Sequence, residues 1–205
     1  KNMTSRMKLQ YAIDVARGLA DLHDVGVVHA DLTIRQYLVY DDNDNDSTGR
    51  KRLQLGDFNQ GIILQMNTTS SSSNSSMNKP TTTACTFTMT NNYGTTRAPE
   101  EYKHEIQTKA VDIWSLGSIL HHILTGQKVW SEYNKNRAQN AVVDGKLPRV
   151  SLAILKSTDP IDELLLKARD MCYVYDPGGR ANAREVTLLL ETGLKQRTEG
   201  RNVVL

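Results

Sequence analysis

Apolar side chains recur every three or four residues in several stretches of the chain, and the first such stretch covers residues 4–23. This spacing places the apolar groups along one side of an α-helix. Gly26 follows just past the end, where helices favour glycine. The pattern predicts a long, largely buried helix. Its apolar positions are Leu9, Ala12, Ile13, Val15, Ala16, Leu19, Ala20 and Leu22.

The same period returns in the second half of the chain. Residues 113–124 are the most apolar of these stretches and predict a second buried helix, which ends at Gly126. Shorter periodic stretches predict helices over residues 138–143, 161–173 and 183–194. The fold is therefore expected to be mainly α.

Two short runs, residues 37–40 and 52–55, have β-like composition and flank a polar loop. They predict a small antiparallel hairpin. The alternating Asp and Asn residues of the loop superficially resemble a calcium loop. However, Ser47 and Leu53 stand where such a loop needs a glycine and a glutamate, so a solvated turn is the better interpretation.

Residues 67–92 consist almost entirely of Ser, Thr, Asn and small side chains. Such a segment buries too little apolar surface to offset the entropy of ordering it. We therefore expect a flexible insert here, within a domain that spans residues 1–196 and is followed by a tail over residues 197–205.

Composition sets limits on the class of protein. The chain has 205 residues, 39% of them hydrophobic and 23% charged, with a formal net charge of +2. These values predict a globular domain and argue against a dedicated nucleic-acid binder, which carries a basic excess. Cys85 and Cys172 lie far apart, as expected of reduced thiols inside the cell.

Targeting signals are also absent from the sequence as it stands. No apolar leader follows Lys1, and no run of about 18 apolar residues predicts a membrane span. We expect an intracellular protein, either cytoplasmic or on the cytoplasmic side of a membrane protein with a span upstream.

Two carboxylates are the strongest candidates for chemistry. Asp31 precedes the predicted hairpin and Asp57 follows it, so their loops can meet in space. Phosphoryl transfer needs one carboxylate near the acceptor hydroxyl and another to hold Mg²⁺ on the nucleotide phosphates. A single Asp is more often a turn residue, so further motifs must decide.

Those motifs are found along the whole chain. Residues 29–36, His-Ala-Asp-Leu-Thr-Ile-Arg-Gln, and residues 57–59, Asp-Phe-Asn, resemble the His-Arg-Asp-Leu-x-x-x-Asn loop and the Asp-Phe-Gly motif of eukaryotic protein kinases. Ala-Pro-Glu at 98–100, Asp-Ile-Trp-Ser-Leu-Gly at 112–117 and the Cys-to-Arg segment at 172–180 match later motifs of that family in the same order. The chain is similar to this family over essentially its whole length.

The resemblance implies ATP and Mg²⁺ as cofactors and a protein as substrate or binding partner. Asp31 would be the catalytic base or orienting carboxylate, and Asp57 the main Mg²⁺ ligand. Gln36 would be the second metal ligand and, with Thr33, would lie in the nucleotide-binding site. Two structural roles follow as well: Glu100 would pair with Arg180 in the interior, and Asp112 would hydrogen-bond the backbone around His29.

Several positions depart from the family pattern. Ala30 replaces Arg and removes the main partner of an activation-loop phosphate. Thr33 replaces Lys and removes a positive charge near the transferred group. Gln36 replaces Asn and reaches one methylene further, whereas Asn59 replaces Gly mildly because Asn tolerates positive φ. In the activation segment, Tyr93 stands where the family usually has Thr.

A Gly-rich phosphate loop, a Val-Ala-x-Lys motif and their helix glutamate are missing from this sequence. The resemblance therefore implies a kinase-like C-terminal (large) lobe, mainly α, with a small β-hairpin at the catalytic loop. Its expected function is transfer of the γ-phosphate of ATP to protein Ser/Thr (or Tyr) hydroxyls once joined to a small lobe.

Two alternatives remain. The departures at the catalytic loop favour a pseudokinase that acts as a protein-interaction scaffold. A small-molecule phosphotransferase of the aminoglycoside or choline kinase type also lacks the Arg, but residues 98–100 and 112–117 argue against it because that class lacks this activation segment. His121 and His122 do not suggest a metal site, since adjacent helical residues point about 100° apart.

Overall fold

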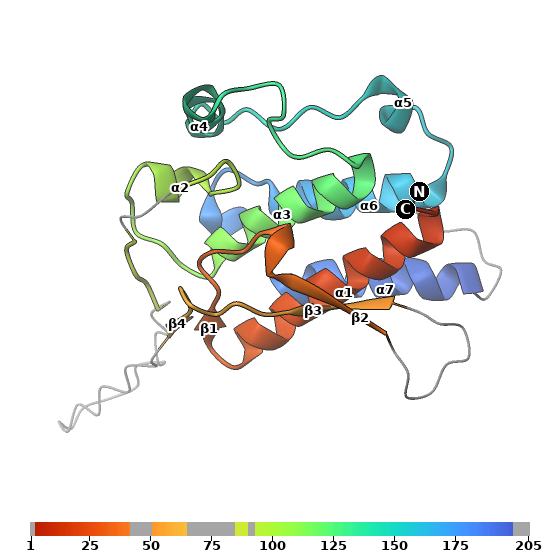
Figure 1. Ribbon diagram of the computed structural model, residues 1–205, viewed down its shortest axis with the longest axis horizontal. Helices are drawn as coiled ribbons and strands as arrows, with labels where there is room; N and C mark the ends of the chain where they lie inside the picture. Colours follow the sequence, from red (N-terminus) through yellow and green to blue (C-terminus); the bar gives the residue numbers. More distant parts are fainter. Residues whose placement is uncertain (1–2, 42–50, 65–84, 90–92, 199–205) are drawn as a thin grey trace, which may run out of the picture.

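Helices dominate the computed structural model, which describes residues 3–41, 51–64, 85–89 and 93–198. Two small antiparallel sheets of two strands each accompany them (Figure 1). The expected mainly helical fold is confirmed. The elements are α1 (Ser5–Asp24), β1 (Val27–Val28), the 3₁₀ turn η1 (Ile34–Gln36), β2 (Tyr37–Asp41), β3 (Lys51–Leu55), β4 (Ile62–Ile63), α2 (Pro99–Tyr102), α3 (Ala110–Thr125), α4 (Lys135–Val143), α5 (Leu152–Leu155), α6 (Pro160–Cys172), the 3₁₀ turn η2 (Pro177–Gly179) and α7 (Ala183–Thr198).

Each helix predicted from the periodicity is present within a few residues of its expected bounds. Helix α1 begins after Thr4, whose hydroxyl oxygen accepts a hydrogen bond from the amide of Met7 at 3.3 Å. Such a cap satisfies one of the amides that the first turn of a helix leaves unpaired. Helix α3 ends at Gly126, which adopts a φ of 73° that side chains disfavour.

Four helices surround the main core. Helix α3 packs along α6, α1 packs along α7, and the two pairs contact each other through α1 with α3 and α6 with α7 (Figure 1). At Gly117 of α3, an added Cβ would lie 3.0 Å from Cβ of Cys172 on α6. A Cβ at this distance would be tighter than most real Cβ contacts, so a larger residue here would push Cys172 away by a few tenths of an ångström.

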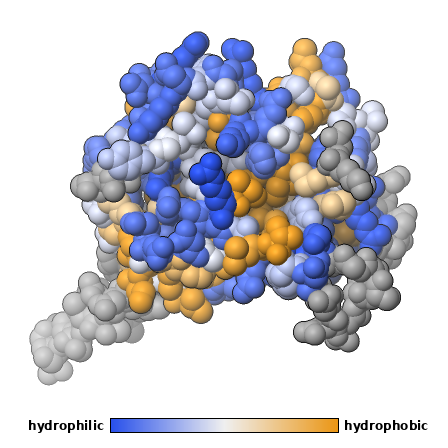
Figure 2. All heavy atoms as spheres, in the orientation of Figure 1, coloured by the Kyte–Doolittle hydropathy of each residue, from blue (hydrophilic) through white to orange (hydrophobic). Residues whose placement is uncertain are grey.

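The hairpin of β2 and β3 lies against α1. Tyr37 pairs with Leu55 in the register, and the hydroxyl of Tyr37 donates a hydrogen bond to the carbonyl of Val15 at 2.9 Å. The outer side of β2 stays open, and Figure 2 shows apolar side chains gathered there; Leu38 is 66% exposed. The predicted hairpin is confirmed, while the calcium-like part of its loop lies outside the described residues.

Most of the predicted flexible insert also lies outside the described residues. At its C-terminal end, residues 85–89 are described, and Phe87 forms an isolated β-bridge with Gln107. Phe87 and Met89 pack on a second apolar cluster that contains Trp114 and Trp130. The flexibility of the insert and the domain limits at residues 196 and 197 stay predictions.

Two expectations about single residues agree with the structure. His121 is buried and His122 is half-buried, as expected for adjacent positions on one helix. Cys85 and Cys172 are not joined in a disulfide bond. Across the described part of the chain, no helix combines the length and the apolar character that a membrane crossing requires.

Glu100 and Arg180 form the expected buried ion pair. The two carboxylate oxygens of Glu100 accept hydrogen bonds from both terminal nitrogens of Arg180, one of them at 2.8 Å. The same guanidinium donates to the carbonyls of Val174, Tyr175 and Ala110. This pair therefore joins α2, the start of α3 and the segment before η2.

Replacing Arg180 with Leu should lower the free energy of unfolding by about 3–5 kcal/mol, because Glu100 would keep a buried, uncompensated charge. Denaturation by urea measures the change. Arg184→Leu is the matched control, since Arg184 pairs with Asp21 and Asp24 on the exposed surface and its loss should move the midpoint little. Equal shifts in the two variants would contradict the structural role of the Glu100–Arg180 pair.

The stability of the protein should fall between pH 6.5 and pH 4 through His121. Burial, reinforced by Arg169, lowers the pKa of His121 to about 4. The folded state keeps this ring neutral while the unfolded chain takes up a proton below about 6.5, so acid favours unfolding. Urea denaturation at several pH values should give a shallower loss in His121→Gln than in the wild type; identical slopes would disprove the assignment.

Candidate active site

Asp112 of α3 holds the predicted catalytic loop by its backbone. One carboxylate oxygen accepts the amide of His29 at 2.7 Å, and the other accepts the amide of Ala30 at 2.9 Å. The ring of His23, on α1, lies 2.9 Å from the first oxygen. Because Asp112 is 1% exposed, these contacts provide the hydrogen bonds that a buried carboxylate requires. The expected role of Asp112 is confirmed.

Two residues of the site adopt a backbone conformation that is unusual for side chains other than glycine. Ala30 has a φ of 60° and Asp57 a φ of 59°. Such conformations cost about 1–3 kcal/mol and persist where the surrounding structure fixes them, most often at functional sites. At Ala30, the hydrogen bond to Asp112 is one of the contacts that fix the backbone.

The loops that carry Asp31 and Asp57 are joined to each other. Nε2 of His29 lies 3.1 Å from the carbonyl oxygen of Gly56, and the amide of Gly56 donates to the carbonyl of Gln36 at 2.8 Å. The rings of His29 and Phe58 are 5.6 Å apart. The pairing of β2 with β3 therefore brings the two predicted motifs to the same end of the hairpin.

The carboxylate of Asp31 is held by an arginine that the motif comparison does not include. Nη2 of Arg97 donates to Oδ1 of Asp31 at 2.6 Å, and Nη1 donates to the carbonyl of Ala30. The side chain of Asp31 remains 37% exposed. Arg97 directly precedes the Ala-Pro-Glu motif, and this adjacency is the only sequence signal that could have drawn attention to it.

Glu101 lies on the other side of Arg97. Its Oε1 is 3.3 Å from Nη1 of Arg97, and its Oε2 accepts the amide of Ala98 at 2.6 Å. Burial raises the pKa of Glu101 to about 7, while the Arg97 guanidinium and the Ala98 amide act in the opposite direction. Sequence reasoning missed this second carboxylate too.

The predicted metal ligands are close to the hairpin end but are partly engaged with protein groups. The amide of Asn59 donates to Oδ1 of Asp57 at 2.8 Å, and Asp57 is exposed. The hydroxyl of Thr33 donates to Oε1 of Gln36. Among the described residues, no group of three or more His, Cys, Asp or Glu side chains could hold a metal ion.

This donor set nonetheless suits Mg²⁺ on a nucleotide. Magnesium is held in such sites by one or two protein oxygens together with phosphate oxygens and water. Asp57 offers Oδ2 as a hard anionic ligand from an exposed position. The amide oxygen of Gln36 has a second lone pair besides the one that Thr33 uses. Asp57 and Gln36 would therefore hold the ion.

Leu38 adds an apolar surface beside these polar groups. It follows Gln36 by two residues on β2, is 66% exposed, and its Cδ1 lies near the backbone of Gly56. Together with its exposed neighbours Val39 and Tyr40, it forms an apolar surface next to the site. The sequence alone predicts no function for these residues.

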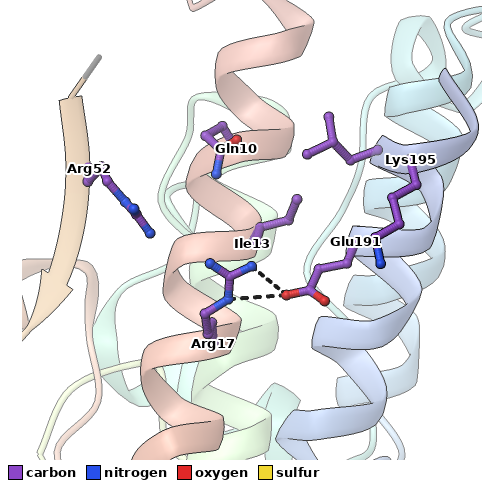
Figure 3. A pocket seen from close by; sticks show the side chains of 7 residues that line it. Gln10, Ile13, Arg17, Arg52, Glu191 and Lys195 are labelled. Carbon is purple, nitrogen blue, oxygen red and sulfur yellow. Dashed lines mark hydrogen bonds and ion pairs between the residues drawn. The ribbon is translucent and has the colours of Figure 1, made fainter. Parts of the chain in front are cut away.

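A separate hollow of about 360 Å³ lies between α1, β3 and α7. Figure 3 shows Arg17 of α1 directed at Glu191 of α7, and their closest atoms are 2.5 Å apart. Arg52, from β3, lies 3.8 Å from Asp14. The charged groups of Arg17, Glu191 and Arg52 are thus paired within the protein. None of the residues that line the hollow belongs to the candidate site.

Comparison with known proteins gives a consistent result. The model of the family described as "Protein kinase domain" matches residues 1–201 of the chain. Similar curated proteins include serine/threonine-protein kinase VIK of Arabidopsis thaliana, 26% identical over 92% of the chain and 38% of the relative. Mitogen-activated protein kinase kinase kinase 10 of Xenopus laevis is 26% identical over 88% of the chain and 16% of its own length.

A third relative is serine/threonine-protein kinase/endoribonuclease IRE1b of Arabidopsis thaliana, which is 28% identical over 82% of the chain and 18% of its own length. The chain therefore spans less than half the length of each of these relatives.

Asp112→Asn should loosen the predicted catalytic loop. The new amide group would face a backbone N–H of His29 or Ala30, leaving a buried donor unpaired at a cost of about 1–3 kcal/mol. Hydrogen exchange should speed up at the amides of these two residues. Ser118→Ala, which removes a buried hydrogen bond to Tyr173 elsewhere on α3, should leave their exchange unchanged. Unaltered exchange in Asp112→Asn would contradict the role assigned to this carboxylate.

Proposed function

The chain belongs to the protein kinase domain family, and from this premise we propose that it is the large lobe of a kinase that transfers the γ-phosphate of ATP to a hydroxyl group of a protein. The observation that carries the proposal is the joining of two loops: His29 and Gly56 are in contact, and the loops of these two residues present Asp31 and Asp57 at one end of the hairpin.

Asp31 has the properties of the group that receives the hydroxyl proton. Its Oδ1 is bound by Arg97, and the side chain is partly exposed. Oδ2 is then available to accept a hydrogen bond from an incoming hydroxyl. Orientation of the acceptor and removal of its proton are the main tasks of a carboxylate in phosphoryl transfer.

The nucleotide side of the site is assigned to the hairpin end. Mg-ATP, when bound, supplies the phosphoryl group and neutralises charge on the phosphates. Asp57 and Gln36 would hold the ion, and Thr33 would keep the Gln36 amide in place through its hydroxyl. Leu38 would offer its exposed apolar face to the flat base of the nucleotide.

Ser or Thr is the proposed acceptor in preference to Tyr. Two of the relatives named above are described as serine/threonine-protein kinases and the third as a mitogen-activated protein kinase kinase kinase. Transfer to matched Ser, Thr and Tyr peptides measures this preference.

One observation favours a second function, that of a pseudokinase which binds partner proteins without transferring phosphate. The Gln36 amide oxygen accepts the Thr33 hydroxyl, and Asp57 accepts the Asn59 amide, so both proposed metal ligands already have protein partners. A cation must then share these oxygens with hydrogen-bond donors.

Activity of two variants separates the two functions. In the full-length protein, Asp57→Asn should abolish Mg²⁺-dependent transfer from labelled ATP, and Asp31→Asn should reduce kcat by about 100-fold or more. Asp144→Asn is the control, because Asp144 is exposed on the surface and pairs with Lys146. It should leave transfer unchanged.

One result would contradict the proposed activity, and another the role of Asp57 in it. A folded wild-type protein that transfers no phosphate to Ser, Thr or Tyr acceptors would contradict the kinase function and support the pseudokinase function. Transfer that survives in Asp57→Asn would remove Asp57 from the metal site.

A further inference from the structure

Arg97 is a buried cation at the centre of the candidate site. It is 8% exposed and directs its guanidinium at the predicted catalytic loop. Burial of a charge is unfavourable unless the group is paired and hydrogen-bonded. The partners of Arg97 therefore show what the structure uses this charge for.

Those partners come from three parts of the chain. Nη2 binds Asp31 at 2.6 Å, Nη1 binds the carbonyl of Ala30 and the carboxylate of Glu101, and Nε binds the carbonyl of Tyr93 at 3.1 Å. A planar fork of five N–H donors can serve acceptors in several fixed directions at once. Arg97 therefore links the catalytic loop, the activation segment and α2.

The peptide groups around Ala30 are held from both sides. The amide of Ala30 donates to Asp112, and its carbonyl accepts from Arg97. Ala30 has a φ of 60°, which an alanine adopts only under constraint. The residue that follows it is Asp31, so the direction of the Asp31 side chain depends on these contacts.

Glu101 fixes Arg97 in turn. It is 2% exposed and uses one oxygen for Arg97 and the other for the amide of Ala98. Arg97 thus lies between two carboxylates, a deeply buried one on α2 and a partly exposed one in the loop. The inner contact orients the guanidinium, and the outer contact transmits that orientation to Asp31.

We propose that Arg97 is the positioning residue for Asp31. Ala30 cannot provide a cation from the catalytic loop, and Arg97 supplies one from the activation segment without any phosphate group. The proposal rests on the proposed function. It adds that the site is assembled by contacts present in the unphosphorylated chain, so activity does not depend on phosphorylation of the activation segment.

The test uses the full-length protein after phosphatase treatment. Arg97→Lys keeps the charge but cannot reach all the acceptors of Arg97. Its kcat, corrected for the folded fraction, should fall by about 10- to 100-fold, with the KM for ATP changed by less than about twofold. Phosphatase treatment itself should leave the wild-type kcat unchanged.

Arg169→Lys is the matched control. Arg169 is also a buried arginine, at 4% exposed, and binds the carbonyl of Pro148 and the carboxylate of Asp170, away from the candidate site. Its replacement should lower the melting temperature and leave kcat per folded molecule unchanged. An unchanged kcat in Arg97→Lys as well would overturn the positioning role.

A double-mutant cycle supplies a readout that does not need activity. The melting temperature should fall less on Arg97→Lys in an Asp31→Asn background than in the wild type, because the contact between the two residues is already weakened there. Equal falls would overturn the proposal whatever the activity.

The outcomes also separate this proposal from the proposed function. If the folded wild type transfers no phosphate, the proposed function fails, and the cycle alone decides whether Arg97 holds Asp31. If the wild type is active only before phosphatase treatment, the phosphate-independent assembly is wrong while the kinase function stands.

Discussion

The buried carboxylate of Asp112 is the constraint on which the candidate site depends. Its oxygens accept the amides of His29 and Ala30 and lie within hydrogen-bonding distance of His23. A carboxylate this deep in the protein must have such donors, because water cannot supply them. The loop amides provide the hydrogen bonds that the charge of Asp112 requires. The same hydrogen bonds hold the loop in place, although its backbone is strained at Ala30. Helix α3 therefore sets the position of the loop.

A second set of charges fixes the opposite side of the same loop. The Glu100–Arg180 pair joins α2 to the start of α3, and Arg97 lies just before α2. Buried ion pairs contribute little net stability compared with apolar packing, but breaking one is costly. Their effect here is to leave few alternative placements for the segment. Asp31 is consequently held between a carboxylate on α3 and a guanidinium whose own position depends on α2.

The sequence predicted the parts of this arrangement that repeat along the chain. Helices α1, α3, α6 and α7 follow from apolar positions at a helical period, and Asp112 with its backbone contacts follows from a family motif. Helices of four residues, such as α2 and α5, are too short to show a period. The contact of Arg97 with Asp31 joins residues 66 positions apart. Spacing cannot reveal such a pair, since only the folded chain brings the two charges together.

The departures from the family pattern gain a physical meaning from these contacts. An alanine at position 30 leaves the loop without the guanidinium that would bind an activation-loop phosphate. The carbonyl of Ala30 and the carboxylate of Asp31 instead bind the guanidinium of Arg97. The cation that links loop and segment thus lies on the segment, and its acceptors lie in the loop. A guanidinium on the loop would need a separate charge on the activation segment to bind it. A guanidinium on the segment joins the segment to the loop directly, through its own hydrogen bonds to Ala30 and Asp31. The placement of Arg97 and that of Asp31 are then coupled, because the hydrogen bond between them forms only when both residues are in place.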